Sequence, residues 1–315
     1  MIFHFAGTAL ALIIERLVGY PKPLYQKIGH PVEWIGRLIA KLEADLNRGD
    51  SRRLKGIAAC VLLLVIVVIP SLFISALLVH IKFGWIVEAL LATTFIAQHS
   101  MAEHVSAVAK GLNVSLHEGR TAVAKIVGRD PTSLDESAIS RAALESLAEN
   151  TSDGIVAPAL WFALLGLPGI VMYKAINTAD SMVGHKSERY RDFGWAAARL
   201  DDLVNLPASR LSGLLFAAAA AWNDRQRGID AVRAMWRDAS KHQSPNAGWP
   251  ESALAASLAV KFGGPRSYDG VLVDLPWLGD GREVLTRDDI SKGLRLYATA
   301  MTMLFAASLA CALLF

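Results

Sequence analysis

Residues 141–205 read RAALESLAENTSDGIVAPALWFALLGLPGIVMYKAINTADSMVGHKSERYRDFGWAAARLDDLVN. The first part predicts an amphipathic helix, because Arg141, Glu145 and Glu149 recur at four-residue spacing beside an apolar stripe. We expect a break at 151–154, then the uncharged segment 155–173, then a second polar cluster. Acids and amides beside hydrocarbon are costly unless they are paired or line a cavity. Two polar clusters around one apolar segment therefore indicate a site at a membrane surface.

The apolar segment 155–173 contains Pro158 and the run Gly-Leu-Pro-Gly at 166–169. Such a break favours two half-helices with a turn at depth over one straight crossing. A re-entrant hairpin of this kind returns both polar clusters to the same side of the membrane. A full crossing would place them on opposite sides.

The composition indicates an all-α, polytopic integral membrane bundle with amphipathic cytoplasmic helices. The chain has 315 residues, 53% of them hydrophobic and 19% charged, and a mean hydropathy of +0.35. Its net charge of +3 is small, and no basic run is interleaved with aromatic residues, so nucleic acid is not an expected partner. Cys60 and Cys311 lie in apolar segments, which indicates neither a disulfide framework nor a zinc site.

The whole chain, 1–315, is expected to be one membrane-embedded domain with substantial aqueous loops. Loop 19–55 carries eight Lys and Arg residues, which places it on the cytoplasmic side. Ser133 and Glu136 form a capping-box pattern that predicts the start of the helix with Arg141. The predicted membrane segments are about 1–18, 56–81, 83–102, 155–173 (broken or re-entrant), 206–222 and 294–315.

Five sequence blocks resemble a known family. They are HPVEWIGR (30–37), ESLAENTSDG (145–154), NTADSMVG (177–184), ERYRDFGWAAARLDD (188–202) and SPNAGWPE (244–251). Their order and amino-acid sequences resemble the signature blocks of the adenosylcobinamide-phosphate synthases, which are integral-membrane enzymes of cobalamin biosynthesis. These enzymes join adenosylcobyric acid to aminopropanol or its phosphate with ATP. The N-terminal block departs from the family, which usually carries acids where this chain has Glu15 and Tyr20, so we assign no role there.

The resemblance implies ATP and Mg²⁺ as cofactors and a reaction that passes through an acyl phosphate. No P-loop or dinucleotide-binding turn is present, so the ATP site must be unconventional. Carboxylates are needed for the metal, cations for phosphate and a base for the amine. We expect the metal on Asp180, Asp201 and Asp202. We expect as catalytic residues Glu149, Asp153, His185, Lys186 and Arg189, of which the two acids are also candidate metal ligands. We expect as substrate-binding residues Asn150, Ser152, Asn177, Ser181, Arg199, Asn205, Ser244, Asn246, Trp249 and Glu251.

Other interpretations of these residues stay open at the sequence level. About half of the polar residues could be helix caps or ion pairs. A corrinoid transporter or a non-catalytic membrane accessory protein would also carry broken helices and intramembrane polar groups. The resemblance favours the enzyme, in the inner cell membrane, with its active site on the cytoplasmic side. The bilayer and other membrane enzymes of late cobalamin synthesis are the expected partners, and the identity of the amine is left open.

Overall fold

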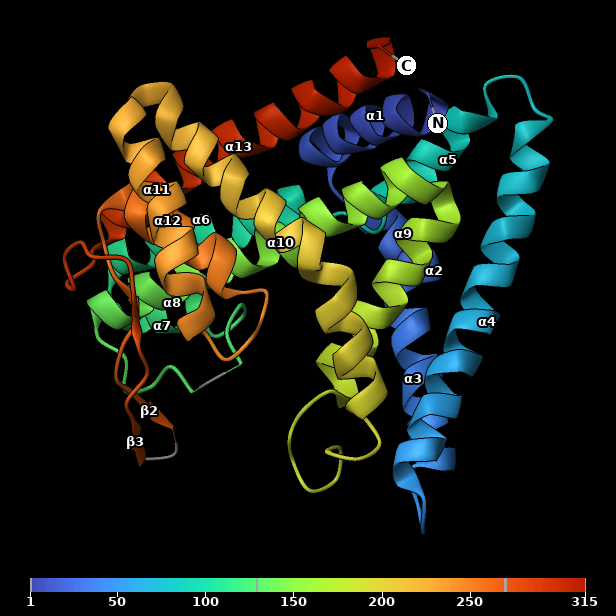
Figure 1. The fold of residues 1–315 in the computed structure, drawn as a ribbon, viewed down its shortest axis with the longest axis horizontal. Helices are drawn as coiled ribbons and strands as arrows, with labels where there is room; N and C mark the ends of the chain where they lie inside the picture. The colour runs from blue at the N-terminus through green and yellow to red at the C-terminus, as the bar shows by residue number, and fades with distance from the viewer. Residues whose placement is uncertain (1, 129, 269–270, 315) are drawn as a thin grey trace. The chain divides into compact units, whose positions relative to one another are not determined.

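The computed structural model describes residues 2–128, 130–268 and 271–314, which are mostly helical (Figure 1). This confirms the predicted all-α class. The helices are α1 (Ile2–Val18), α2 (Lys22–Ile28), α3 (Pro31–Leu46), α4 (Arg52–Val79), α5 (Gly84–Thr93), α6 (Gln98–Val114), α7 (Leu116–Val123), α8 (Glu136–Thr151), the π-helix η1 (Ser152–Val156), α9 (Ala157–Val183), α10 (Trp195–Asn223), α11 (Arg225–Asp238), the 3-10 helix η2 (Ala239–Lys241), α12 (Gly248–Leu258) and α13 (Arg287–Leu314). Four short strands form two antiparallel pairs: β1 (Phe262–Gly263) with β4 (Trp277–Leu278), and β2 (Arg266–Tyr268) with β3 (Val271–Val273).

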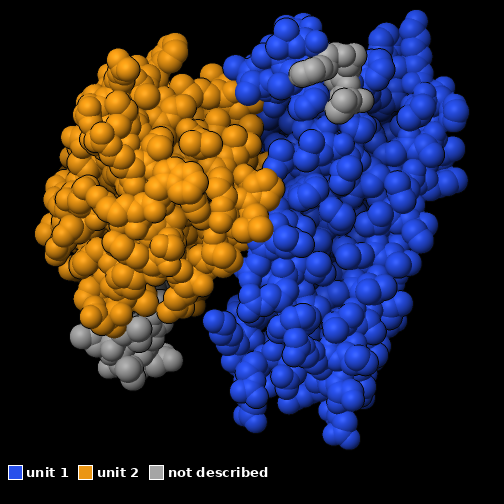
Figure 2. Space-filling view, in the orientation of Figure 1, with its two compact units in different colours: residues 1–97, 157–205, 305–315 blue, residues 98–156, 206–304 orange. Residues whose placement is uncertain are grey.

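The chain divides into two compact units (Figure 2). Unit 1 contains residues 1–97, 157–205 and 305–315, and unit 2 contains 98–156 and 206–304. In unit 1, α9 packs against α1, α3 and α4, and α3 runs beside α4 (Figure 1). In unit 2, α6, α7 and α8 pack together, and α11 packs on α12. The expectation of one membrane-embedded domain stays a prediction.

Four helices of the described chain are long and apolar enough to cross a membrane: Arg52–Val79, Glu136–Val183, Trp195–Asn223 and Arg287–Leu314. They contain most of the predicted segments 56–81, 155–173, 206–222 and 294–315. In α4, 17% of the most apolar stretch is buried within the chain, and large side chains such as Val61, Ile69 and Phe73 are exposed. An exposed apolar surface of this length is suited to lipid.

Two predicted membrane segments differ from the structure. Segment 1–18 forms α1, which is too short to be a candidate membrane span by itself. It is long enough only together with 22–46, from which it is bent by 100°. Segment 83–102 is not one helix, because α5 ends at Thr93 and α6 begins at Gln98. The hydroxyls of Thr93 and Thr94 donate to the carbonyls of Leu90 and Leu91, at 2.6 and 2.8 Å. The chain then closes in a tight turn with i to i+3 hydrogen bonds.

The predicted break at 151–154 is wrong, and so is the predicted helix start. Asp135 is the N-cap of α8, where its side chain accepts a hydrogen bond from the Ala138 N–H at 2.7 Å, so Ser133 lies outside the helix.

At the other end, where a break was predicted at 151–154, α8 continues without a stop through η1 into α9. A proline ring clashes with the carbonyl four residues before it, and Pro158 follows Gly154 at this spacing. The wider π turn of 152–156 accommodates that conflict.

The predicted break at 166–169 is confirmed. Gly166 has φ 66° and ψ −154°, a conformation that is not helical, and it divides α9 at this point. A Cβ atom at Gly166 would lie 2.9 Å from Nε2 of His4, so both the backbone angle and the packing require glycine. Pro168 follows two residues later and lacks the N–H that would continue the helix. Whether the kinked segment is re-entrant stays a prediction.

Asp238 organises the end of α11 in unit 2. Its side chain is 1% exposed. It accepts hydrogen bonds from Arg237 at 2.9 and 2.6 Å, from Lys241 at 2.7 Å and from the Gly279 N–H at 2.9 Å. Burial alone would raise the pKa of the Asp238 carboxyl, but these donors outweigh it and lower the pKa to about 2. The carboxylate thereby joins α11 to the chain after β4.

The first prediction concerns the side of the membrane on which each polar cluster lies. Ser152 is only 2% exposed, so the exposed Glu149 is the better labelling position for the first cluster, with Ser187 for the second. In a chain with Cys60 and Cys311 replaced by alanine, we expect Glu149→Cys and Ser187→Cys both to react with an impermeant thiol reagent in inverted vesicles and not in intact cells. Reaction of the Ser187 variant in intact cells would contradict the re-entrant hairpin.

The second prediction follows from the lowered pKa of Asp238. We expect Asp238→Asn to lose about 2 kcal/mol of stability at pH 7, and the difference from wild type to shrink as the pH falls from about 4 towards 2. The sign follows because a lowered pKa stabilises the folded chain only while the carboxylate is ionised. Melting temperatures in detergent at pH 7 and pH 3 measure this. The control is Asp230→Asn, because the Asp230 side chain is 41% exposed and pairs with Arg233 at the surface. An equal loss of stability at both pH values in the Asp238 variant would refute the assignment.

Candidate active site

Two buried polar contacts join α9 and α10 in unit 1. The Tyr173 hydroxyl donates to Oδ1 of Asn205 at 2.9 Å, and Nδ2 of Asn177 donates to Oδ1 of Asp201 at 3.2 Å. Each helix advances by four residues between the two contacts, so all four side chains lie on facing stripes of antiparallel helices. Tyr173 and Asn205 are fully buried and Asp201 is 9% exposed. The structure therefore brings together three sequence-predicted residues, Asn177, Asp201 and Asn205.

The buried amide of Asn205 lies between Tyr173 and Asp201. Its Oδ1 atom accepts from Tyr173. Its Nδ2 atom is buried and makes no hydrogen bond of good geometry within the described part of the chain, but the amide interacts favourably with the Asp201 carboxylate, one helical turn away. Buried amide donors are nearly always satisfied by protein, water or ligand, so Asn205 and Asp201 form one polar unit.

Asp180 adds a second acid near the end of α9. Its carboxylate interacts electrostatically with Asp201, Asp202 and His185. The chain turns immediately after it, and a Cβ atom at Gly184 would lie 1.9 Å from Oδ1 of Asp180. The acid can adopt this position only because glycine occupies the turn. Three carboxylates are therefore gathered near one end of the α9–α10 pair.

These acids are suited to a hard cation, although they do not form a complete cage. Asp202 is already paired with Arg199 at 3.1 Å. Within the residues that the structure describes, no three His, Cys, Asp or Glu side chains form a group that could hold a metal ion by themselves. Magnesium sites often use one or two carboxylates and complete their coordination with water and substrate phosphate. Asp180 and Asp201 fit that pattern, and the metal assignment stays a prediction.

The loop 184–194 between α9 and α10 holds the predicted cations. Lys186 and His185 are exposed, and no described residue forms an ion pair with Lys186. Arg189 instead makes a bidentate contact with Glu43 of α3, with both nitrogen–oxygen distances 3.0 Å. Asn47 Nδ2 also donates to the Arg189 carbonyl at 3.1 Å. Arg189 therefore anchors the loop on α3, whereas Lys186 is available for a ligand. Ser181 is also committed locally, to the Asn177 carbonyl at 2.9 Å.

The block 244–251 surrounds Arg210 in unit 2. Nη1 of Arg210 donates to Oδ1 of Asn246 at 2.8 Å, and the guanidinium lies over the Trp249 ring at 4.5 Å. Ser209 donates to the same Asn246 oxygen at 3.1 Å. Ser244 accepts hydrogen bonds from two backbone N–H groups and so stabilises the turn before α12. These contacts hold the block on α10, and the predicted substrate-binding role of Asn246 and Trp249 stays untested.

The first motif block is also in unit 2, at the α8–η1 junction. Asn150 donates to the carbonyl and hydroxyl of Ser146 at 2.9 and 3.2 Å. Ser152 is buried and its hydroxyl has no partner among the described residues. Glu149 is exposed and Asp153 is partly buried, on adjacent turns. Glu251 is 4% exposed and lies 3.7 Å from His242 in the same unit.

Sequence reasoning gave no site role to Tyr173, Glu43 or Arg210. Tyr173 could have been found from its position, four residues before Asn177 on the same helix face. Arg210 had a signal too, because a lone cation in an apolar segment needs a partner. Glu43 had none, since its partner Arg189 is far away in the sequence.

The third prediction separates the two possible roles of Arg189. If the residue only anchors the loop, Arg189→Gln and Glu43→Gln should lower the melting temperature similarly, and the double variant should be no worse than either single variant. Arg191→Gln, in the same loop and exposed, is the control. A role on phosphate predicts a different pattern, in which Arg189→Gln loses activity and Glu43→Gln retains it.

Comparison with known proteins places the chain in a family. The family described as CobD/Cbib protein matches residues 8–297. A relative named cobalamin biosynthesis protein CobD, from Sinorhizobium fredii, is 48% identical over 96% of this chain and 95% of its own length. Proteins of the same name from Rhodobacter capsulatus and Brucella suis are 49% and 45% identical, each over 94% of this chain and 93% of theirs. No solved structure matches significantly. The chain belongs to the CobD/Cbib family, which confirms the resemblance to the adenosylcobinamide-phosphate synthases.

Proposed function

We propose that this protein acts in cobalamin biosynthesis as an ATP-dependent amide synthase. It would join the carboxyl group of adenosylcobyric acid to aminopropanol or aminopropanol phosphate. The family supports the pathway. The observation that supports catalysis is the pair of contacts Tyr173–Asn205 and Asn177–Asp201, which holds a carboxylate and the amides of Asn177 and Asn205 together next to apolar helices.

The acids of unit 1 are suited to the charge problem of the reaction. Amide synthesis from a carboxylate needs activation by nucleotide, and the phosphates bring negative charge to the site. Asp180 and Asp201 would hold Mg²⁺, which when bound neutralises phosphate charge and orients it. Repulsion between neighbouring carboxylates favours a cation there. Asp202 would act mainly through its pair with Arg199.

Other residues of unit 1 would bind and orient the reactants. Lys186 lies on an exposed loop and is proposed to contact phosphate. Asn205 is proposed to orient the Asp201 carboxylate through its Nδ2 group, with which Asp201 interacts, while Tyr173 holds its Oδ1 atom. His185 is proposed to accept the proton that the amine loses. The catalytic roles of Glu149 and Asp153 are proposed on the family resemblance alone.

Transport of a corrinoid is the second candidate. The observation that favours it is the kink at Gly166 within a candidate membrane span, since broken helices with polar ends also form transport sites. The two candidates differ in their products. An amide synthase consumes nucleotide in proportion to amide formed, whereas a transporter leaves the corrinoid unchanged.

The fourth prediction tests the acids. We expect Asp180→Asn and Asp201→Asn each to reduce amide formation by at least about 100-fold, because each change removes charge from the proposed metal site. Their melting temperatures should stay close to that of wild type. The assay uses purified protein in detergent with ATP, Mg²⁺, adenosylcobyric acid and each amine supplied separately.

Glu88→Gln is the matched control for that experiment. Glu88 is a buried acid of α5 that accepts a hydrogen bond from Ser75, and it belongs to no motif block. Its loss should leave amide formation largely intact. Near-normal turnover in both aspartate variants would remove the metal assignment, and inactivity of a folded Glu88 variant would move the site and favour transport.

A further inference from the structure

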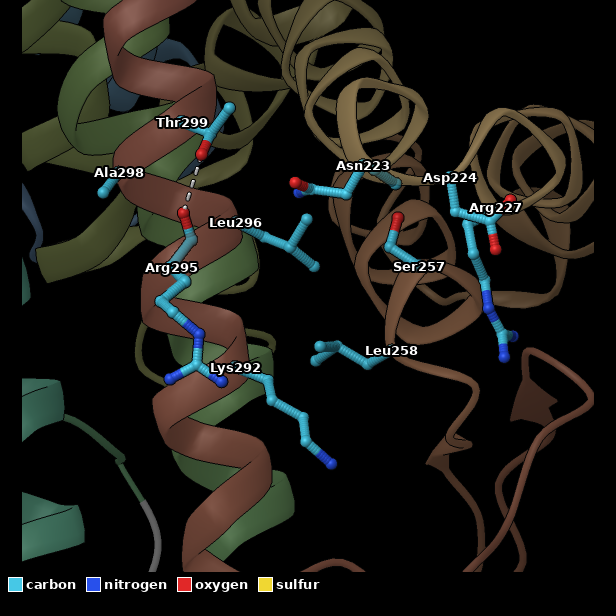
Figure 3. Close-up of a pocket in the computed structure, with 11 residues that line it drawn as sticks. Asn223, Asp224, Arg227, Ser257, Leu258, Lys292, Arg295, Leu296, Ala298 and Thr299 are labelled. Carbon is cyan, nitrogen blue, oxygen red and sulfur yellow. Dashed lines mark hydrogen bonds between the residues drawn. The ribbon is translucent and has the colours of Figure 1, made fainter.

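A pocket of about 600 Å³ lies within unit 2, apart from every motif block (Figure 3). It is lined by the end of α10, the start of α11, the end of α12 and the first part of α13. Figure 3 shows Lys292 and Leu296 extending from α13 towards the opposite side, where the Asn223 amide and Leu258 extend towards α13. The pocket thus has a mixed lining of apolar side chains and polar groups.

The charge of this pocket is strongly positive. Arg227, Lys292 and Arg295 line it, against a single acid, Asp224. The Asp224 carboxylate is already used as the N-cap of α11, where it accepts a hydrogen bond from the Gln226 N–H at 2.9 Å. Three cations therefore face one carboxylate that is committed elsewhere.

The donors in this pocket are not used by the rest of the protein. Within the described chain, the side chains of Arg227, Arg295 and Asn223 make no hydrogen bond or ion pair. Lys292 has one ion pair, with Asp289, at the long distance of 3.5 Å. The buried Asp289 is bound more closely by Arg282. Cations that line one cavity and are left largely without internal partners are suited to an external anion.

The position of the pocket along the two long helices restricts the source of that anion. The part of α10 that precedes Asn223 is uncharged from Leu211 onwards, and α13 is uncharged after Arg295. Both helices are candidate membrane spans. Trp222, which precedes the lining residue Asn223 in the sequence, is 77% exposed, as is typical of aromatic residues at the membrane surface. The cations therefore lie where apolar helix gives way to polar chain, which is the level of lipid head groups.

We propose that this pocket binds an anionic phosphate-bearing group, with Arg295 and Lys292 of α13 on one side, Arg227 on the opposite side and Asn223 as an additional donor. Guanidinium groups bind phosphate oxygens in a bidentate manner. Leu258 and Leu296 would contact the apolar part of a lipid whose head group is bound. Basic pockets between membrane helices recognise anionic head groups in this way. The same chemistry would accept a free phosphate, so the test must distinguish the two sources.

The test measures binding to the full chain in an uncharged detergent. Short-chain dihexanoyl phosphatidylglycerol, dihexanoyl phosphatidylcholine and inorganic phosphate are titrated separately, and binding is followed by the rise in melting temperature and by native mass spectrometry. We expect phosphatidylglycerol to bind and phosphatidylcholine not to. Arg227→Gln and Arg295→Gln should each weaken binding about threefold to tenfold, a range reduced for the exposure of the pocket.

Arg233→Gln is the matched control, because Arg233 is on the same helix as Arg227 but is paired with Asp230 at 3.6 Å. It should bind like wild type. Binding of inorganic phosphate as tight as that of phosphatidylglycerol, lost in the same variants, would support the site and assign it to free phosphate. Equal binding of phosphatidylcholine, or unchanged binding in both arginine variants, would overturn the proposal. Without ligand, all variants must keep the wild-type melting temperature. The variants at Arg227 and Arg295 each test the pocket independently of the other.

Discussion

Polar groups placed against hydrocarbon must find partners, and the contacts between α9 and α10 satisfy this requirement. An unpaired buried amide or carboxylate costs several times what its hydrogen bond contributes once it is paired. The constraint is met by two pairs, Tyr173 with Asn205 and Asn177 with Asp201. The pairs are four residues apart on each helix. The register fixes where Asp201 lies, and the turn at Gly184 fixes where Asp180 lies. The proposed chemistry of unit 1 depends on these positions.

Two of the motif blocks that were predicted to bind ligands, 188–202 and 244–251, also hold the protein together. Arg189 is committed to Glu43, and Asn246 is committed to Ser209 and Arg210. A residue that is anchored in this way can still support a site, because catalytic groups need neighbours that fix their orientation. Lys186 differs from them, since it is exposed and forms no ion pair within the described chain. A ligand can therefore bind Lys186 without displacing a protein contact.

The sequence predicted the helical class, four of the long apolar segments and the break at Gly166, because hydrophobicity and glycine–proline runs are local signals. It also located Asn177, Asp201 and Asn205, which the structure brings together. It failed at 151–154, where glycine normally ends a helix but a π turn continues it. It also failed to show that Arg189 pairs with Glu43, since nothing local links two residues so distant in the chain. The Tyr173 contact needed the register of α9 on α10, which only packing determines.

The length of α4 makes bilayer thickness a variable for this protein. Its uncharged part, residues 56–79, measures roughly 36 Å at about 1.5 Å per residue, against about 30 Å of hydrocarbon. Such a stretch tilts in a thin bilayer and stands more upright in a thick one. Because α3 packs along α4 and carries Glu43, the Arg189–Glu43 pair links the α9–α10 loop to this helix. The loop would therefore be sensitive to lipid chain length, through a helix that holds none of the proposed site residues.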